Sequence, residues 1–254
     1  MITQTLDRLW PAPIGKAHQR SIVPADSSRT LHMPHTLNAY GDQSTHKMAG
    51  FGNDISSQRL DDLDKAAISC LLRNPGSTFL DLGCGEARVG LAASLIAGST
   101  ILVDAVDLSQ KVQKFRALMH APVRFLHLDA KALTPDLLPP LHIAYSQRFI
   151  HYLRYAEALD LLSVVFSRSE PGASLFLSAS GIQSELGDRY EDAHVHVEDR
   201  YCPLEARMAE KHNILGCVCL YDLEDLERLA TSAGYQKVHV YRSDFGNIKG
   251  IFQK

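Results

Sequence analysis

The chain of 254 residues is long enough to bury a substantial core, and its 45% hydrophobic and 22% charged content is ordinary for a globular protein. Its net charge is −3, and it has no run of Lys and Arg. Proteins that bind nucleic acids usually carry an excess of basic residues, so a nucleic-acid partner is not expected. We find no signal peptide and no membrane-length apolar run, and the five cysteines are scattered. These features predict a cytoplasmic protein with reduced thiols and no membrane partner.

The first 55 residues are rich in Pro, His, Ser and Thr and show no sustained periodicity, which predicts a partly irregular N-terminal arm over residues 1–55. We expect residues 56–254 to form a single domain. Its first element is predicted to be a helix over residues 57–72, because apolar residues recur there at helical spacing.

The segment TFLDLGCGEARVG, residues 78–90, joins a short apolar strand to a helix predicted over residues 86–97. Asp81 stands two positions before Gly83 in the turn between them. Glycines let the backbone approach a ligand, and the first turn of a helix offers unpaired N–H donors. A dinucleotide-binding turn is a rival, but its third glycine would fall at Arg88, so a nicotinamide-dependent oxidoreductase is the weaker alternative.

Further strands that end in acids follow this turn. A strand predicted over residues 101–107 ends in Asp107, which lies 22 positions after Gly85 and precedes a helix that begins after Ser109. A third strand is predicted over residues 123–129 and ends in Asp129; a fourth covers residues 141–146. Because the carboxyl ends of parallel strands share one edge, these strand ends predict a common ligand crevice.

The rest of the chain continues the alternation of helices and strands. We predict a helix over residues 155–167, a fifth strand over 174–178, a helix over 223–233, and two last strands over 237–242 and 247–252 joined by a hairpin-length turn. Residues 181–220 interrupt this order and are expected to form an insertion. Repeated strand and helix spacing is typical of right-handed crossovers and a parallel sheet.

The glycine turn resembles the first motif of the class I S-adenosylmethionine (SAM) dependent methyltransferases, D/E-x-G-x-G-x-G. The acid is Asp81, two glycines are Gly83 and Gly85, and Ala87 replaces the third. The resemblance implies an α/β fold with a seven-stranded, mostly parallel sheet, an antiparallel last strand beside the fifth, and flanking helices. It also implies SAM as the cofactor and S-adenosylhomocysteine (SAH) as the product.

The same resemblance implies the cofactor contacts. Asp107 would bind the ribose hydroxyls, Leu108 would lie against the adenine, and Asp129 would meet the adenine amino group. The residues alone leave open that Asp107 caps a helix and that Asp129 is an ordinary loop acid. The full set of expected cofactor-binding residues is Asp81, Gly83, Cys84, Gly85, Asp107, Leu108, Asp129, Ala130, Ser146 and Gln147.

The sequence says less about the residues that bind the methyl acceptor. His151, just after the fourth strand, is the candidate catalytic base, because an imidazole with an ordinary pKa near ~6.5 accepts protons at neutral pH. A histidine packed against the sheet is the alternative. The insertion is expected to be a lid over the substrate, with a zinc site, a polar surface or a dimer contact as alternatives; no metal is assigned. Candidate substrate contacts are Tyr40, His46, Tyr190, His194, His196, Tyr201 and His212.

These features predict a SAM-dependent methyltransferase that transfers a methyl group to an O, N or C atom of a small-molecule acceptor by in-line displacement. A protein or tRNA methyltransferase is one alternative. A non-catalytic SAM- or SAH-binding regulatory or scaffold protein is another, because the acids predict ligand binding in either case. A homodimer is compatible with the insertion, and the sequence does not identify the acceptor.

Overall fold

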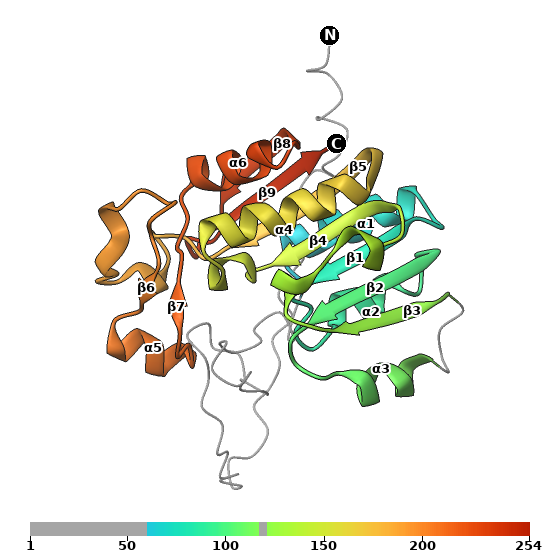
Figure 1. Ribbon diagram of the computed structural model, residues 1–254, viewed down its shortest axis with the longest axis horizontal. Coiled ribbons are helices and arrows are strands. Elements are labelled where there is room, and N and C mark those ends of the chain that lie inside the picture. The colour runs from blue at the N-terminus through green and yellow to red at the C-terminus, as the bar shows by residue number, and fades with distance from the viewer. Residues whose placement is uncertain (1–59, 117–120) are drawn as a thin grey trace, which may run out of the picture. The chain divides into compact units, whose positions relative to one another are not determined.

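A seven-stranded sheet lies at the centre of the computed structural model, which describes residues 60–116 and 121–254 (Figure 1). The predicted arm over residues 1–55 lies outside the described residues, and so do Tyr40 and His46. The strands follow the order β3-β2-β1-β4-β5-β9-β8. Their bounds are β1 Thr78–Leu82, β2 Ser99–Asp104, β3 Val123–His127, β4 Leu141–Gln147, β5 Ser169–Ala179, β8 Gln236–Arg242 and β9 Ile248–Gln253.

The pairing of the strands confirms the predicted fold class. The strands from β3 to β5 are parallel, whereas β9 is antiparallel to both β5 and β8 and lies between them. The chain builds β1, β2 and β3 in one direction and then crosses to β4 on the other side of β1. An open sheet binds its ligands at such a reversal of strand order, outside the carboxyl ends of the strands.

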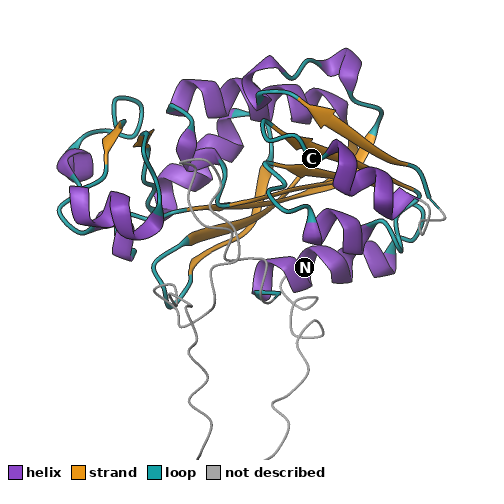
Figure 2. Ribbon diagram, turned by 90° about the horizontal axis from the view of Figure 1, so that it is seen from below, coloured by secondary structure: helices purple, strands orange, loops and turns teal. Residues whose placement is uncertain are grey.

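Helices cover both faces of the sheet (Figure 2). Alternate residues of a strand point to opposite faces, so Phe79 packs with α1 and α2, whereas Leu80 packs with α4 and α6. The helix α3 packs beside α2, because Val112 and Leu91 share one apolar cluster. The helix bounds are α1 Asp62–Arg73, α2 Arg88–Ala93, α3 Ser109–Arg116, α4 Tyr155–Arg168, α5 Ala206–His212 and α6 Leu223–Ser232.

Local hydrogen bonds move several boundaries from their predicted places. Helix α1 begins at Asp62 because the Asp61 side chain accepts hydrogen bonds from two backbone amides in a capping box. Helix α2 covers only residues 88–93, because Ala87 before it has a left-handed backbone with φ 56°. Strand β2 ends at Asp104 rather than Asp107, since the Asp104 carboxylate accepts from Val106 N and turns the chain.

Strand β5 is longer than predicted. It begins at Ser169 and includes an irregular stretch in which the register to β4 shifts, and Gly172 adopts φ 83° there. The predicted punctuation at residues 170–172 is therefore a bend inside the strand rather than a loop before it. The last two strands form the predicted antiparallel hairpin, closed by a hydrogen bond from Ser243 N to Asn247 O (2.9 Å).

The insertion folds around a small apolar core of its own, which includes Leu186, Tyr190 and Met208. Its two ends are hydrogen-bonded to each other, since Tyr221 N donates to Ser180 O and Ile182 N donates to Tyr221 O, each at 3.0 Å. Its elements are η4 Glu185–Gly187, η5 Glu191–His194, β6 Cys202–Pro203, α5 and β7 Cys217–Val218.

A buried arginine ties the insertion to the main body. The Arg200 guanidinium donates to Leu220 O, to Val195 O and to the Asp225 carboxylate on α6, the last at 2.7 Å. Both partners of this ion pair are 5% exposed. His194 belongs to η5 rather than to a strand, and the side chains of His194 and His196 are exposed.

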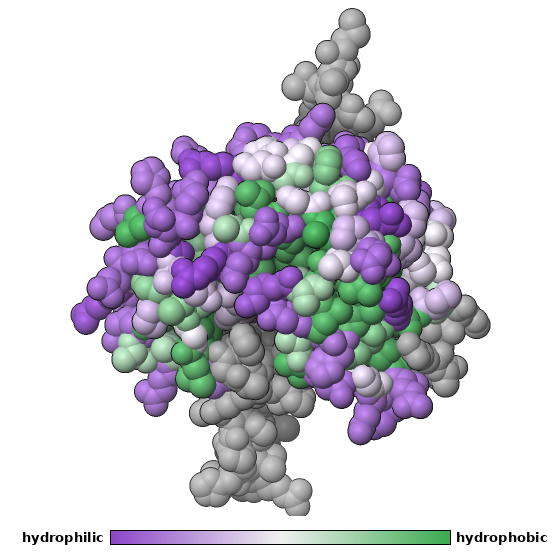
Figure 3. Space-filling model, viewed as in Figure 1, coloured by the Kyte–Doolittle hydropathy of each residue, from purple (hydrophilic) through white to green (hydrophobic). Residues whose placement is uncertain are grey.

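On the face drawn in Figure 3, apolar side chains gather toward the middle and hydrophilic ones cover much of the insertion. Among the residues that the structure describes, none of the helices is long and apolar enough to span a membrane.

Candidate cofactor and acceptor site

A cavity of about 320 Å³ opens at the carboxyl ends of β1, β2 and β4 and reaches the insertion. We call the part near the glycine turn and β2 the cofactor half. It is lined by Asp81, Gly83, Cys84, Gly85, Arg88, Val89, Val103, Asp104, Ala105, Val106, Asp129, Ala130, Lys131, Tyr145 and Gln147. The remainder, the acceptor half, is lined by Arg148, Phe149, His151, Tyr152, Leu153, Ser180, Ser184, Leu186, Tyr201, His212, Ile214 and Asn247.

The glycine turn brings bare backbone to the cavity. Gly83 and Gly85 have φ values of 63° and 51°, which favour glycine because it has no Cβ. The N–H donors of this turn are already used, since Gly83 N and Cys84 N donate to Val103 O at 2.9 and 3.1 Å. These two amides are therefore occupied, and what the turn offers a ligand is close approach to its backbone.

Asp81 joins the end of β1 to α2. It is 3% exposed, and its Oδ2 accepts a hydrogen bond from Gly90 N at 3.0 Å. A Cβ atom at Gly90 would lie 2.8 Å from that oxygen, so the glycine lets the helix approach the carboxylate. The buried acid thus keeps a fixed position in the cavity wall.

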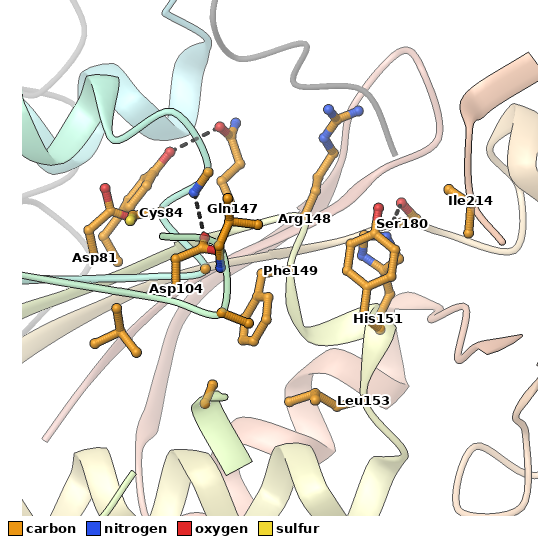
Figure 4. A pocket seen from close by; sticks show the side chains of 18 of the residues that line it. Asp81, Cys84, Asp104, Gln147, Arg148, Phe149, His151, Leu153, Ser180 and Ile214 are labelled. Carbon is orange, nitrogen blue, oxygen red and sulfur yellow. Dashed lines mark hydrogen bonds between the residues drawn. The ribbon is translucent and has the colours of Figure 1, made fainter. Parts of the chain in front are cut away.

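Asp104, rather than Asp107, brings a carboxylate to the cavity from the end of β2 (Figure 4). Its Oδ2 accepts from Gly85 N and its Oδ1 accepts from Val106 N, both at 2.8 Å. Asp107 lies outside the cavity lining, and its carboxylate accepts from Ser109 N at 2.8 Å; hydrogen bonds from the Ser109 side chain and backbone lower its pKa. Sequence spacing did offer a signal for Asp104, which lies 19 positions after Gly85.

The segment after β3 also reaches the cofactor half. Asp129, Ala130 and Lys131 line it, and the Asp129 side chain accepts from Lys131 N at 3.0 Å as the cap of a short 3₁₀ turn. Leu108, which was expected against the adenine, is instead buried in the apolar cluster beneath α3 and lies outside the lining. Val106 supplies an apolar side chain to the wall there.

The two polar residues at the end of β4 have different roles. Ser146 is fully buried and donates to Leu82 O at 3.1 Å, so it joins β4 to β1 and lies outside the lining. Gln147 lines the cavity, and its side-chain oxygen accepts from the Tyr145 hydroxyl at 3.0 Å. Its side-chain nitrogen donates to Asp61, so its amide is held at both ends.

This contact continues into a buried polar network beneath α1. The Tyr145 hydroxyl also donates to Asp64, and Lys249 on β9 pairs with Asp61 at 2.6 Å. Burial and the nearby Asp61 raise the pKa of Asp64 to about 6. The network connects the start of α1, β4 and β9, and it orients Gln147 at the cavity.

His151 is a neutral side chain deep in the acceptor half. It is 2% exposed, and burial together with the nearby Arg148 charge lowers its pKa to about 3. Its Nε2 lies 3.5 Å from Ser180 Oγ (Figure 4), while its Nδ1 has no hydrogen-bond partner among the described residues. Such a histidine is a weak base, but it has hydrogen-bonding capacity left for a ligand.

The insertion contributes some of its predicted residues and not others. Tyr201 and His212 line the acceptor half, and the Tyr201 hydroxyl donates to Tyr152 O at 3.1 Å. Tyr190 is absent from the lining, because its hydroxyl donates to Val218 O at 2.5 Å inside the core of the insertion. The exposed His194 and His196 likewise lie outside the lining.

His212 faces a carboxylate. Its Nε2 is 3.3 Å from Glu185 Oε2, and Glu185 also pairs with Lys211. Burial lowers the pKa of His212, and the Glu185 charge opposes that effect. The described residues contain no group of three or more His, Cys, Asp or Glu arranged to hold a metal ion.

Sequence reasoning missed several residues of the acceptor half. Arg148 directly follows β4, Ser180 directly follows β5, and Asn247 directly precedes β9. Their common signal is position, since each lies at a strand end on the edge where an α/β sheet binds its ligands.

Compared by sequence, the chain matches no protein-family model and no curated protein. Solved structures do match its fold. A SAM-dependent methyltransferase from Methanosarcina mazei is 20% identical, with a TM-score of 0.55 over 71% of this chain and 93% of that one. The 1,6-didemethyltoxoflavin-N1-methyltransferase of Burkholderia thailandensis, with its acceptor and SAH bound, is 14% identical, with a TM-score of 0.57 over 79% and 81%.

A third match is the magnesium protoporphyrin IX methyltransferase of Synechocystis with bound SAH, which is 14% identical, with a TM-score of 0.54 over 75% of this chain and 81% of that one. These identities are low, and the agreement lies in the arrangement of the chain. The described residues therefore have the class I fold of SAM-dependent methyltransferases.

Proposed function

We propose that this protein is a SAM-dependent methyltransferase that acts on a small-molecule acceptor. The observation that carries the proposal is the continuity of one cavity from the glycine turn and Asp104 to His151 and the insertion. A cofactor at the strand ends would then face an acceptor in the other half. The fold shared with methyltransferases that bind SAH supports this reading.

The residues of the cofactor half fit a nucleoside thioether. The Asp104 carboxylate accepts from Gly85 N and Val106 N, which hold it at the end of β2, and a carboxylate is an acceptor suited to ribose hydroxyls. Val106 offers an apolar surface for a base, and Asp129 lies near it as an acceptor for an amino group. The buried Asp81 carboxylate would favour the positive charge of SAM.

Bound there, SAM supplies a methyl carbon on a sulfonium leaving group. The work of the chain is then to align the acceptor nucleophile with that carbon and to exclude water. Phe149, Leu153 and Ile214 make parts of the acceptor wall apolar. Because the acceptor lies between strand ends and an insertion with its own core, we expect it to be small.

We propose different roles for the two histidines of the acceptor half. His151, with its pKa near 3, suits a hydrogen bond to the acceptor better than proton removal. His212 is better placed as the base, because Glu185 lies 3.3 Å from its Nε2 and would stabilise the imidazolium that forms. An acceptor hydroxyl would lose its proton to His212 as its oxygen forms the new bond to carbon.

Titration calorimetry and label transfer test the proposal. We expect SAM and SAH to bind and NAD not to bind, and we expect methyl-labelled SAM to label a small molecule in a deproteinised metabolite extract. Binding without any transfer would support a regulatory or scaffold protein instead. Tighter binding of NAD than of SAM would favour an oxidoreductase.

A further inference from the structure

We propose that the methyl acceptor carries a carboxylate, and that Arg148 binds it. This inference rests on the proposed function and names the chemical class of its substrate. Arg148 directly follows β4 and lines the acceptor half, and Figure 4 shows it between Gln147 on one side and His151 with Ser180 on the other.

The Arg148 charge has no partner in the part of the chain that the structure describes. Its guanidinium makes no hydrogen bond or ion pair within residues 60–116 and 121–254, although other cations near the cavity have partners there. Lys131, for example, lies 3.6 Å from Asp129 and 3.7 Å from Glu157. Arginine presents a planar set of donors that matches a carboxylate in two parallel hydrogen bonds.

The wall around Arg148 carries no acidic side chain among the described residues. Within the described part of the chain, no Asp or Glu lines the acceptor half, which otherwise presents apolar, hydroxyl, amide and imidazole groups. Burial is the main cause of the pKa shifts of His151, Tyr152 and His212, lowering the first and last and raising that of Tyr152; the Arg148 charge acts to lower all three, so its field reaches across this half. Glu185, the nearest acid of the insertion, is already paired with Lys211. The wall is therefore electropositive and suited to an anion.

The backbone of Arg148 is strained. Its φ of 47° is left-handed, a conformation that is unfavourable for a residue with a Cβ. Its N–H donates to Ser178 O at 3.0 Å, so the neighbouring strand β5 holds this conformation. The strained backbone fixes the point from which the guanidinium extends, which reduces the entropy lost when an anion binds.

The apolar part of the wall indicates that the rest of the acceptor is apolar. Phe149, Tyr152, Leu153, Leu186 and Ile214 contribute apolar or aromatic side chains to the same half. A ligand that joins a ring-sized apolar body to a carboxylate would satisfy both features. Benzoate is the simplest probe of this chemistry, and benzamide is its neutral isostere.

The test is calorimetric titration of the full chain, saturated with SAH, with benzoate and with benzamide. We expect millimolar binding of benzoate, at least tenfold weaker binding of benzamide, and at least a tenfold loss of benzoate affinity in Arg148→Gln. Arg148→Lys should retain part of that affinity. Arg189→Gln is the matched control, because Arg189 also has a left-handed backbone (φ 54°) but is exposed and outside the lining.

Other results overturn the inference. Equal affinities for benzoate and benzamide, or an unchanged benzoate affinity in Arg148→Gln, would show that this arginine binds no carboxylate of an acceptor. A loss of SAH affinity in Arg148→Gln with benzoate binding unchanged would assign Arg148 to the carboxylate of the cofactor. Failure of the wild-type chain to bind SAH is a separate result, which would refute the proposed function.

Discussion

The ring of Phe149 lies against the backbone of Gly83, so that a Cβ atom at Gly83 would come within 2.2 Å of the ring's Cγ and 2.6 Å of its Cβ. This contact joins the turn after β1 to the segment after β4, and it sits where the two halves of the cavity meet. Because the second atom is close to the Phe149 backbone, a side-chain rotation alone cannot relieve the clash.

We therefore expect Gly83→Ala to lower the free energy of unfolding by roughly 2–4 kcal/mol, the sum of left-handed strain and a forced displacement of Phe149. Chemical denaturation measures this loss. Gly76→Ala is the matched control, since Gly76 also has a left-handed φ (87°) but its Cβ would meet nothing within 4 Å. It should cost only about 1 kcal/mol. Equal losses in the two variants would contradict the proposed packing.

Variants of Asp104 and Asp107 distinguish the two residues that could bind the ribose hydroxyls. If Asp104 binds the hydroxyls, Asp104→Asn should weaken SAH binding at least about tenfold, since hydrogen bonds to a charged group contribute roughly 1.5–3 kcal/mol. Asp107→Asn should change it less than about twofold, within the usual effect of a distant surface substitution. Calorimetric titration with SAH measures both. If Asp107→Asn weakens SAH binding more than Asp104→Asn does, Asp107 binds the ribose, as the resemblance implies.

Protonation of His151 should make folding sensitive to mild acid. The unfolded chain binds a proton at this residue near pH 6.5, whereas the folded chain binds it only near pH 3. Protons therefore favour the unfolded state in this window, and stability is lost as the pH falls below 6.5. We expect a loss of about 2 kcal/mol between pH 7 and pH 5 that His151→Gln abolishes.

Denaturation curves of wild type and His151→Gln at several pH values isolate this effect. The raised pKa of Asp64, about 6, acts in the opposite direction, because the folded state there binds its proton more tightly. The difference between wild type and variant removes that contribution. A difference that does not change with pH would show that His151 titrates normally in the folded protein.

The Arg200–Asp225 pair should be important for holding the insertion. Arg200→Met leaves the Asp225 carboxylate buried without its counter-charge, which typically costs 3–5 kcal/mol. Hydrogen exchange should show the largest loss of protection over the insertion and the start of α6. Arg228→Met, at the exposed pair with Glu198, is the control and should change stability far less, because solvent screens that pair. Comparable losses in the two variants would mean that Arg200 does not anchor the insertion.

Sequence patterns of short range were enough to predict the sheet and its helices. Apolar runs marked the strands, the first three lead into acids or glycines, and the motif around Asp81 led to the correct fold class. The ends of helices and strands that are set by capping hydrogen bonds were harder to predict from the sequence. Strand β2 ends at Asp104 because that side chain binds Val106 N, an event that hydrophobic spacing does not reveal. The expected strand ends therefore reach the cavity, but the acid that lines it after β2 is Asp104, three residues before Asp107.

The sequence by itself determined the order of strands and helices, because the periods of apolar residues and the turn-forming glycines act over a few neighbouring positions. Only the tertiary structure decided which side chains reach the cavity. Lys249 meets Asp61 across 188 positions, Phe149 packs on Gly83, and His151 becomes buried beside Arg148. These contacts depend on how distant segments pack, and no local sequence pattern encodes that packing. Burial in the packed structure then sets which groups are charged.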